Sequence, residues 1–215
     1  MAKKAVWQDD YWLMLMHIYL HRPVGVKPLY NREMVDLSLE LHIPPQTLQS
    51  RMKQIAQLST PRIERIWKTY SDKPMRLARA VRLLREMKGF GAFDDFYDGV
   101  AVQETFERDF RPLPEDGRLT PAMLILILDL YYQLTPSTMV SQTPEVVALA
   151  RLIGLKATDV VQVLDVFQIC DPYLERNEVT SSPLLPPCQQ LWQRMSDKEP
   201  QHIHTLAEEL KEYFR

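Results

Sequence analysis

Glycine and cysteine are scarce in this chain, and long apolar runs are lacking. The 215 residues include six glycines and two cysteines, Cys170 and Cys188, which are too far apart for a CxxC pair. These counts exclude a collagen-like repeat, a disulfide framework and a zinc ribbon. No uninterrupted apolar stretch approaches the roughly 18 residues of a membrane span. Because 46% of the residues are hydrophobic, we expect a folded, soluble protein with a sizeable core and no membrane partner. The spacing of the two cysteines favours a reduced, cytoplasmic setting.

Strand signals are few, whereas helix starts are well marked. The Asp116-Gly117 pair has the composition of a hairpin turn, but its flanks do not alternate in polarity. The chain has 16 prolines, and several follow a capping threonine: Thr60-Pro61, Thr120-Pro121 and Thr143-Pro144. By periodicity alone, the apolar run from Met123 to Leu130 also fits a buried strand. The helix-start signals, together with the scarcity of strand signals, predict an all-α, multihelical protein.

The sequence repeats itself weakly. A shift of 112 positions aligns two long stretches without a gap, so that Tyr19 meets Tyr131 and apolar positions coincide on both sides. After one deletion, Pro61–Arg65 matches Pro172–Arg176. We interpret this pattern as two tandem repeats over about residues 7–65 and 119–176, joined in a single domain 1–215. Chance similarity among helices is the alternative interpretation.

Each repeat is expected to contain three helices, of which the first is apolar on nearly every side. The first repeat has them near residues 10–21, 31–41 and 45–58, and the second near 120–134, 143–153 and 157–169. The run from Met123 to Leu130 aligns with the first predicted helix of the first repeat, whose Met and Leu residues favour helix. We therefore expect this run to be helical as well. Further helices are predicted over 61–70, 74–88 and 188–195, after a Ser- and Pro-rich linker at 177–187, and toward residue 215.

The second and third helices of each repeat have the spacing of a helix-turn-helix. That motif needs a small residue where the helices cross and a turn residue four positions later. Ala150 and Gly154 fill these places in the second repeat, and Ser38 and His42 fill them in the first. Any helical hairpin in a bundle gives a similar pattern, so an ordinary bundle is the alternative.

The outer surfaces of the two third helices differ. The first repeat displays polar side chains that can contact base edges or phosphates, namely Gln46, Gln49, Ser50, Arg51 and Lys53. Its counterpart offers mainly Val160, Val161, Val163, Asp165 and Val166, and we expect it to be buried or to form a protein interface. Gln46, Gln49, Ser50 and Lys53 are therefore the candidate DNA contacts.

Charge is divided unevenly along the chain. Residues 1–88 carry 16 basic and 8 acidic side chains, whereas the remainder carries 10 basic and 20 acidic ones. Arg62, Arg65 and Lys68 share one predicted helix, and four arginines recur every three positions on the next: Arg76, Arg79, Arg82 and Arg85. This arginine band is a candidate phosphate-binding surface. A solvated face that balances the acidic half of the protein is the alternative.

Catalytic and metal-binding patterns are weak. The Asp94–Asp98 segment fits the DDxxD pattern that holds magnesium and diphosphate, but the chain has no second acidic motif to face it. His17 and His21 lack an intervening general base, and His202 and His204 face different sides of a helix. Gly-rich phosphate loops and nucleophile elbows are missing. We therefore expect no enzymatic activity, no cofactor and no metal.

The first 60 residues or so resemble the small helical domain that precedes HNH nuclease domains in some bacterial restriction-type proteins. The resemblance rests on Trp7, Asp10, Leu13, Tyr19, Asn31–Val35, Leu37, Leu41, Leu48, Arg51, Met52 and Ile55. The whole chain also resembles small all-helical proteins of Bacteroides-like bacteria. The first resemblance implies work near DNA but no cleavage, because the nuclease half itself is missing.

These observations lead to one functional expectation and one alternative. We expect a non-enzymatic, DNA-associated accessory or regulatory protein that binds double-stranded DNA, with a homodimer supplying a second half-site. The alternative is a helical protein-protein interaction module without nucleic-acid binding, which docks a partner on the apolar third helix of the second repeat or on the C-terminal stripe Ile203, Leu206, Leu210 and Phe214.

Overall fold

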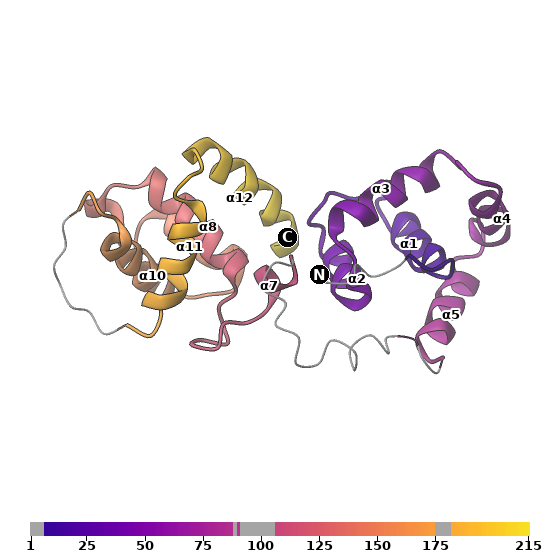
Figure 1. Ribbon diagram of the computed structural model, residues 1–215, viewed down its shortest axis with the longest axis horizontal. Helices are drawn as coiled ribbons and strands as arrows, with labels where there is room; N and C mark the ends of the chain where they lie inside the picture. The colour runs from indigo at the N-terminus through magenta and orange to yellow at the C-terminus, as the bar shows by residue number, and fades with distance from the viewer. Residues whose placement is uncertain (1–6, 88–89, 91–105, 175–181) are drawn as a thin grey trace. The chain divides into compact units, whose positions relative to one another are not determined.

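The computed structural model describes residues 7–87, 90, 106–174 and 182–215. Within these ranges the protein is all-α, as predicted, and contains no strand. The chain divides into two compact units, residues 1–103 and 104–215, with one predicted repeat in each (Figure 1). The single domain predicted over residues 1–215 stays a prediction.

Unit 1 is built around an apolar first helix. Within residues 7–87 its helices are α1 (Tyr11–Leu20), α2 (Arg32–Leu41), α3 (Pro45–Ala56), α4 (Pro61–Tyr70) and α5 (Pro74–Arg85). α1 packs against each of the other four, and its side chains Met14, Leu15 and Met16 are almost wholly buried. A helix that is apolar all round needs cover on every side, which explains its central place in the unit.

Unit 2 is built around a second apolar helix. It comprises α7 (Glu107–Phe110), α8 (Pro121–Gln133), the short 3-10 helix η1 (Pro136–Thr138), α9 (Pro144–Ile153), α10 (Ala157–Cys170), α11 (Leu185–Met195) and α12 (Pro200–Phe214). α8 packs against α7, α9, α10, α11 and α12. The run from Met123 to Leu130 lies in α8, so the helical prediction is confirmed and the strand alternative is wrong.

Side-chain caps mark the starts of α2, α4 and α8, whereas the Thr143 side chain, predicted as the cap of α9, makes no such hydrogen bond. Asn31 accepts a hydrogen bond from Glu33 N, Thr60 from Ile63 N and Thr120 from Met123 N. The predicted linker at 177–187 is wrong at its end, because α11 already begins at Leu185. Its first turn contains Pro186 and Pro187, where a missing N–H costs no helical hydrogen bond. In the part of the chain that is described, no helix has the length and apolarity to cross a membrane.

Candidate nucleic-acid interface

A tight turn joins α2 to α3. His42 adopts the left-handed conformation (φ 54°), and its N–H donates to Ser38 O. Ile43 N donates to the same carbonyl at 3.1 Å, while the buried Ser38 hydroxyl donates to Ile43 O. The small side chain of Ser38 thus lies where the two helices meet, as the sequence predicted.

The turn between α9 and α10 has the same local geometry. Gly154 is left-handed (φ 73°), its N–H donates to Ala150 O, and Leu155 N donates to that carbonyl at 2.9 Å. Ala150 is buried like Ser38. Ser38 and Ala150 are 112 residues apart, and so are His42 and Gly154. This separation equals the shift that aligns the two stretches of sequence.

α3 presents a polar stripe on its outer side. Leu48, Met52 and Ile55 are buried in the core of unit 1, so the opposite side of the helix faces solvent. Three of the four predicted contact residues lie on that side and are exposed, at spacings of four and three residues: Gln46, Ser50 and Lys53. We call these three side chains the α3 surface. It offers one amide, one hydroxyl and one ammonium group, which suit base edges and phosphates.

Two further side chains of α3 turn toward the protein. The fourth predicted contact, Gln49, is half-buried, and its amide donates to Lys27 O at 3.2 Å. The Arg51 guanidinium lies 5.2 Å from the ring centre of Trp7 and 5.7 Å from that of Trp12, and it donates to Gln54 Oε1 at 3.3 Å. These contacts fix the flanks of α3, so Gln49 and Arg51 have a structural use inside unit 1.

The arginine band lies on α5, opposite the buried side chains Leu77, Val81 and Leu84. All four arginines are exposed. Arg85 is already paired, because its guanidinium binds Glu40 of α2 through two hydrogen bonds of 2.7 Å, which raises the pKa of Arg85. The other three form what we call the α5 surface: Arg76, Arg79 and Arg82.

The members of the α5 surface differ in their local contacts. Arg76 lies 5.7 Å from the ring centre of Tyr70, and Arg82 is 3.7 Å from Glu86, the exposed residue that directly follows α5. Arg79 has no charged partner among the described residues. An exposed pair such as Arg82–Glu86 contributes at most about 1 kcal/mol and exchanges readily for a phosphate contact.

The α3 and α5 surfaces lie on different sides of α1. Both helices pack against α1, and in Figure 1 α3 runs above it and α5 below it. α4 connects them along the chain and exposes three more cations, Arg62, Arg65 and Lys68. The eight predicted contact residues therefore do not share one helix face. Six of them form the α3 and α5 surfaces. In unit 1, α3, α4 and α5 carry more basic than acidic side chains, whereas α2 carries more acidic ones.

Sequence reasoning missed Lys27. This side chain is only 5% exposed, and its ammonium group donates to His21 O at 2.7 Å and to Pro23 O. Burial lowers the pKa of Lys27, while Glu33 acts in the opposite direction. Lysine in a polar loop is normally solvated, and nothing in its sequence neighbourhood signals burial.

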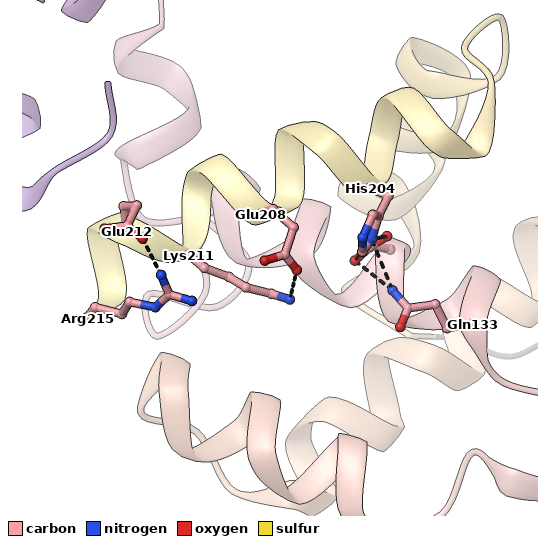
Figure 2. Close-up of polar contacts among 7 residues, drawn as sticks. Gln133, His204, Glu208, Lys211, Glu212 and Arg215 are labelled. Carbon is pink, nitrogen blue, oxygen red and sulfur yellow. Dashed lines mark hydrogen bonds and ion pairs between the residues drawn. The ribbon is translucent and has the colours of Figure 1, made fainter. Parts of the chain in front are cut away.

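The histidines and acidic residues do not form a metal site in the described ranges, where no group of three potential ligands lies together. His21 Nδ1 pairs with Glu33, and burial is the main cause that lowers the pKa of His17. In unit 2, His204 Nδ1 lies 3.1 Å from the buried Asp129 carboxylate, which also accepts from Gln133. Figure 2 shows His204 and Gln133 next to each other. The Asp94–Asp98 motif falls outside the described residues.

The two docking faces of the alternative function are largely buried. On α10, Val160, Val163 and Val166 are covered, and this helix packs against α8, α9 and α11. The C-terminal stripe lies on α12, which packs along α8 and buries Ile203 and Leu210. The outer side of α12 instead carries the ion pairs Glu208–Lys211 and Glu212–Arg215 (Figure 2).

Comparison with protein-family models, with curated proteins and with solved structures finds no match for this chain.

Proposed function

We propose that this chain is a non-enzymatic accessory or regulatory protein that binds double-stranded DNA through unit 1. The observation that carries the proposal is the exposed polar stripe of the α3 surface on the third helix of a helix-turn-helix-like unit. In such motifs the third helix enters the major groove, and its outward side chains contact bases. The α5 surface lies on another side of α1, and in this proposal it binds backbone phosphates beyond the groove that α3 enters.

We further propose that the two units use one three-helix motif twice. Under the 112-residue shift, α2 corresponds to α9 with identical bounds, and α3 and α10 begin at corresponding residues. The left-handed residues His42 and Gly154 also correspond. In this proposal only the first copy contacts DNA, and a homodimer places two copies of α3 on successive half-sites, about one helical turn of DNA apart.

A protein-protein interaction module is the second candidate. It is supported by exposed apolar side chains on unit 1, among them Met75 and Met87 at either end of α5. Its first-choice docking faces on α10 and α12 are mostly covered. Because those faces are covered whereas the α3 and α5 surfaces are exposed, we place the DNA-binding proposal first.

Duplex binding at low salt tests the proposal. Fluorescence anisotropy with a labelled random-sequence duplex should give binding that weakens steeply between about 50 and 200 mM salt, because each phosphate contact releases counterions. The double variant Arg79→Glu/Arg82→Glu should bind at least about tenfold more weakly while keeping its helical circular dichroism. The slope of log K against log salt should fall in magnitude by about two, roughly one for each arginine–phosphate pair that the substitutions remove.

A matched control uses two exposed cations of unit 2. Arg151→Glu/Lys198→Glu changes the net charge by the same amount at residues that lie outside the proposed interface. Equal decreases in affinity for the two double variants would mean that net charge alone attracts the DNA. Failure of the unmodified chain to bind at about 50 mM salt would overturn the proposal in favour of the interaction module.

A further inference from the structure

The loop between α1 and α2 is braced at several points. We call residues 21–28 the Gly25 loop. Gly25 N donates to Tyr19 O at 2.9 Å, and Gly25 has φ +133°, a conformation that L side chains rarely adopt. The Lys27 peptide makes two further contacts, through its N–H to Met52 Sδ at 3.2 Å and through its carbonyl to Gln49 Nε2 at 3.2 Å. These contacts hold the loop in one shape.

Of the contacts that hold the loop, the one made by the buried Lys27 ammonium group carries the largest desolvation cost. This group lies at the carboxyl end of α1, where it binds the carbonyl oxygens of His21 and Pro23. Burying a cation is unfavourable unless polar groups replace its water, and the negative end of a helix dipole supplies part of that compensation.

The braced loop holds apolar side chains in solvent. Val24 is 62% exposed and Val26 is 40% exposed, on either side of Gly25. Arg22 is also exposed, whereas the neighbouring His21 is paired with Glu33. Stiff, β-branched side chains on a fixed loop lose little conformational entropy when they bind a partner.

The Gly25 loop lies alongside α3. Its contacts reach Gln49 and Met52, and Gln49 is one turn beyond Gln46 of the α3 surface. In the inference drawn from this placement, a duplex whose major groove receives α3 also meets this loop. In the major groove the one apolar group on a base edge is the C5-methyl group of thymine.

We infer that the Gly25 loop is a second base-contacting element, in which Val24 and Val26 pack against thymine methyl groups next to the bases that α3 contacts. The inference rests on the proposed function and assigns to it a preference for thymine. Arg22 then lies next to the groove edge, where a phosphate is its natural partner. The amide of Gln49 is an anchor for the loop and makes no base contact.

Replacing thymine by uracil in the DNA tests this inference, because it removes only the methyl groups and keeps every hydrogen bond. The probe is a duplex enriched from a random pool by the full chain, synthesised once with thymine and once with uracil. The unmodified protein should bind the uracil duplex about threefold to tenfold more weakly, as expected for one or two buried methyl groups. The variant Val24→Ser/Val26→Ser should bind both duplexes equally, with an affinity close to that of the unmodified protein for the uracil duplex.

Val140→Ser is the matched control, since Val140 is a similarly exposed valine (44%) in unit 2. It should retain the full preference for thymine. Gly25→Ala strains the loop and should reduce that preference without any change of charge. Equal binding of thymine and uracil duplexes by the unmodified protein would overturn the inference and leave the proposed function standing. Absence of any duplex binding would instead overturn the proposed function.

Discussion

Helices α3 and α10, the third helices of the two predicted repeats, differ less in the exposure of their outer faces than in the charge on those faces. Under the 112-residue shift, the exposed positions of α3 correspond to exposed positions of α10: Gln46, Ser50 and Lys53 to Thr158, Gln162 and Asp165. Both outer faces are exposed to solvent, but the α3 face carries the cation Lys53 and the α10 face carries the anion Asp165. A duplex would be attracted to the first and repelled by the second.

The flanks of the same two helices show where the apolar character of α10 comes from. Arg51 and Gln54 in α3 correspond to Val163 and Val166 in α10. The arginine packs on Trp7 and Trp12, whereas both valines are buried in a helix that packs against α11. The difference between the flanks of α3 and α10 thus follows from the helices and side chains that pack against them, while the outward face of each helix stays exposed.

The cysteines offer the largest expected contrast, because both of them belong to unit 2. Burial raises the pKa of Cys170 to about 11 and that of Cys188 to about 12. Relative to a free thiol of pKa 9.0, the thiolate fraction at about pH 8 falls about 100-fold and about 1,000-fold. Iodoacetamide should therefore label the native chain very slowly and the urea-unfolded chain rapidly, as read by mass spectrometry.

The same raised pKa values give a pH dependence. Below about pH 9 both folded and unfolded thiols are neutral, and between about pH 9 and 12 the unfolded thiols ionise first, so that unit 2 loses stability as pH rises. Complete labelling of the native chain within minutes at about pH 8 would contradict the placement of Cys170, which is half-buried, and of Cys188, which is buried.

A cavity-forming substitution in the buried face of α10 tests whether the two units unfold independently of each other. Phe167 is fully buried, and Phe167→Ala should cost unit 2 about 3–5 kcal/mol of unfolding free energy. Hydrogen exchange should then accelerate in α8 to α12, and the cysteines should become reactive, while amides of α1 keep their protection. Ile55→Ala at the corresponding position of α3 should have the reverse effect. Equal loss of protection in both units would instead favour the single domain predicted from the sequence.

The pairing of α8 with α12 distinguishes unit 2 from unit 1. Asp129 is 4% exposed and contacts His204 and Gln133. Asp129→Ala leaves both partners without their acceptor and should cost about 1–3 kcal/mol in a urea denaturation experiment. Glu208→Ala removes an exposed acid one turn along α12 from His204, and a decrease in stability as large as that of Asp129→Ala would rule out a special role for the buried carboxylate.

Exchanging the sign of charge on α3 tests the functional side of the comparison. Lys53→Asp gives α3 the residue that α10 carries at that position, and duplex affinity should fall about tenfold with little change in stability, because the side chain is exposed. Lys198→Asp in unit 2 is the control with the same change of charge. If the control weakened binding as much, the α3 surface would lose its assignment as the DNA contact.

The smallest expected effect concerns the turn into α10. Gly154 has φ 73°, and the space where a Cβ atom would lie is open, so Gly154→Ala should cost about 1 kcal/mol from backbone strain alone. Gly117→Ala, also in open space but without a positive φ, should be neutral or slightly stabilising. A thermal unfolding series that ranked the two variants in the opposite order would contradict the left-handed turn.

Helix bounds followed from the sequence wherever caps and periodicity agreed. The predicted ends at Leu41 and Ile153 agree with α2 and α9, because His42 and Gly154 close those helices locally. The positions of Gln49, Arg51 and Lys27 could not be predicted. Their contacts depend on how the Gly25 loop and Trp7 fold back on α3, which no local pattern encodes.

The candidate site was predictable in its residue types but not in its layout. Gln46, Ser50 and Lys53 are exposed as expected, since the buried stripe Leu48, Met52 and Ile55 fixes the opposite side of the helix. Arg85 is bound by Glu40, a residue 45 positions away in the sequence, so periodicity gave no sign of that pair. Long-range partners of exposed cations are set by tertiary packing.

The burial of α8 has a consequence for biosynthesis. This helix is apolar on nearly every side, and α11 and α12, which cover part of it, follow more than fifty residues later in the chain. During translation α8 therefore leaves the ribosome well before its last partners do. Throughout that interval the apolar side chains of α8 that α11 and α12 later cover stay exposed on the nascent chain. Chaperones that bind apolar segments would bind α8 at that stage.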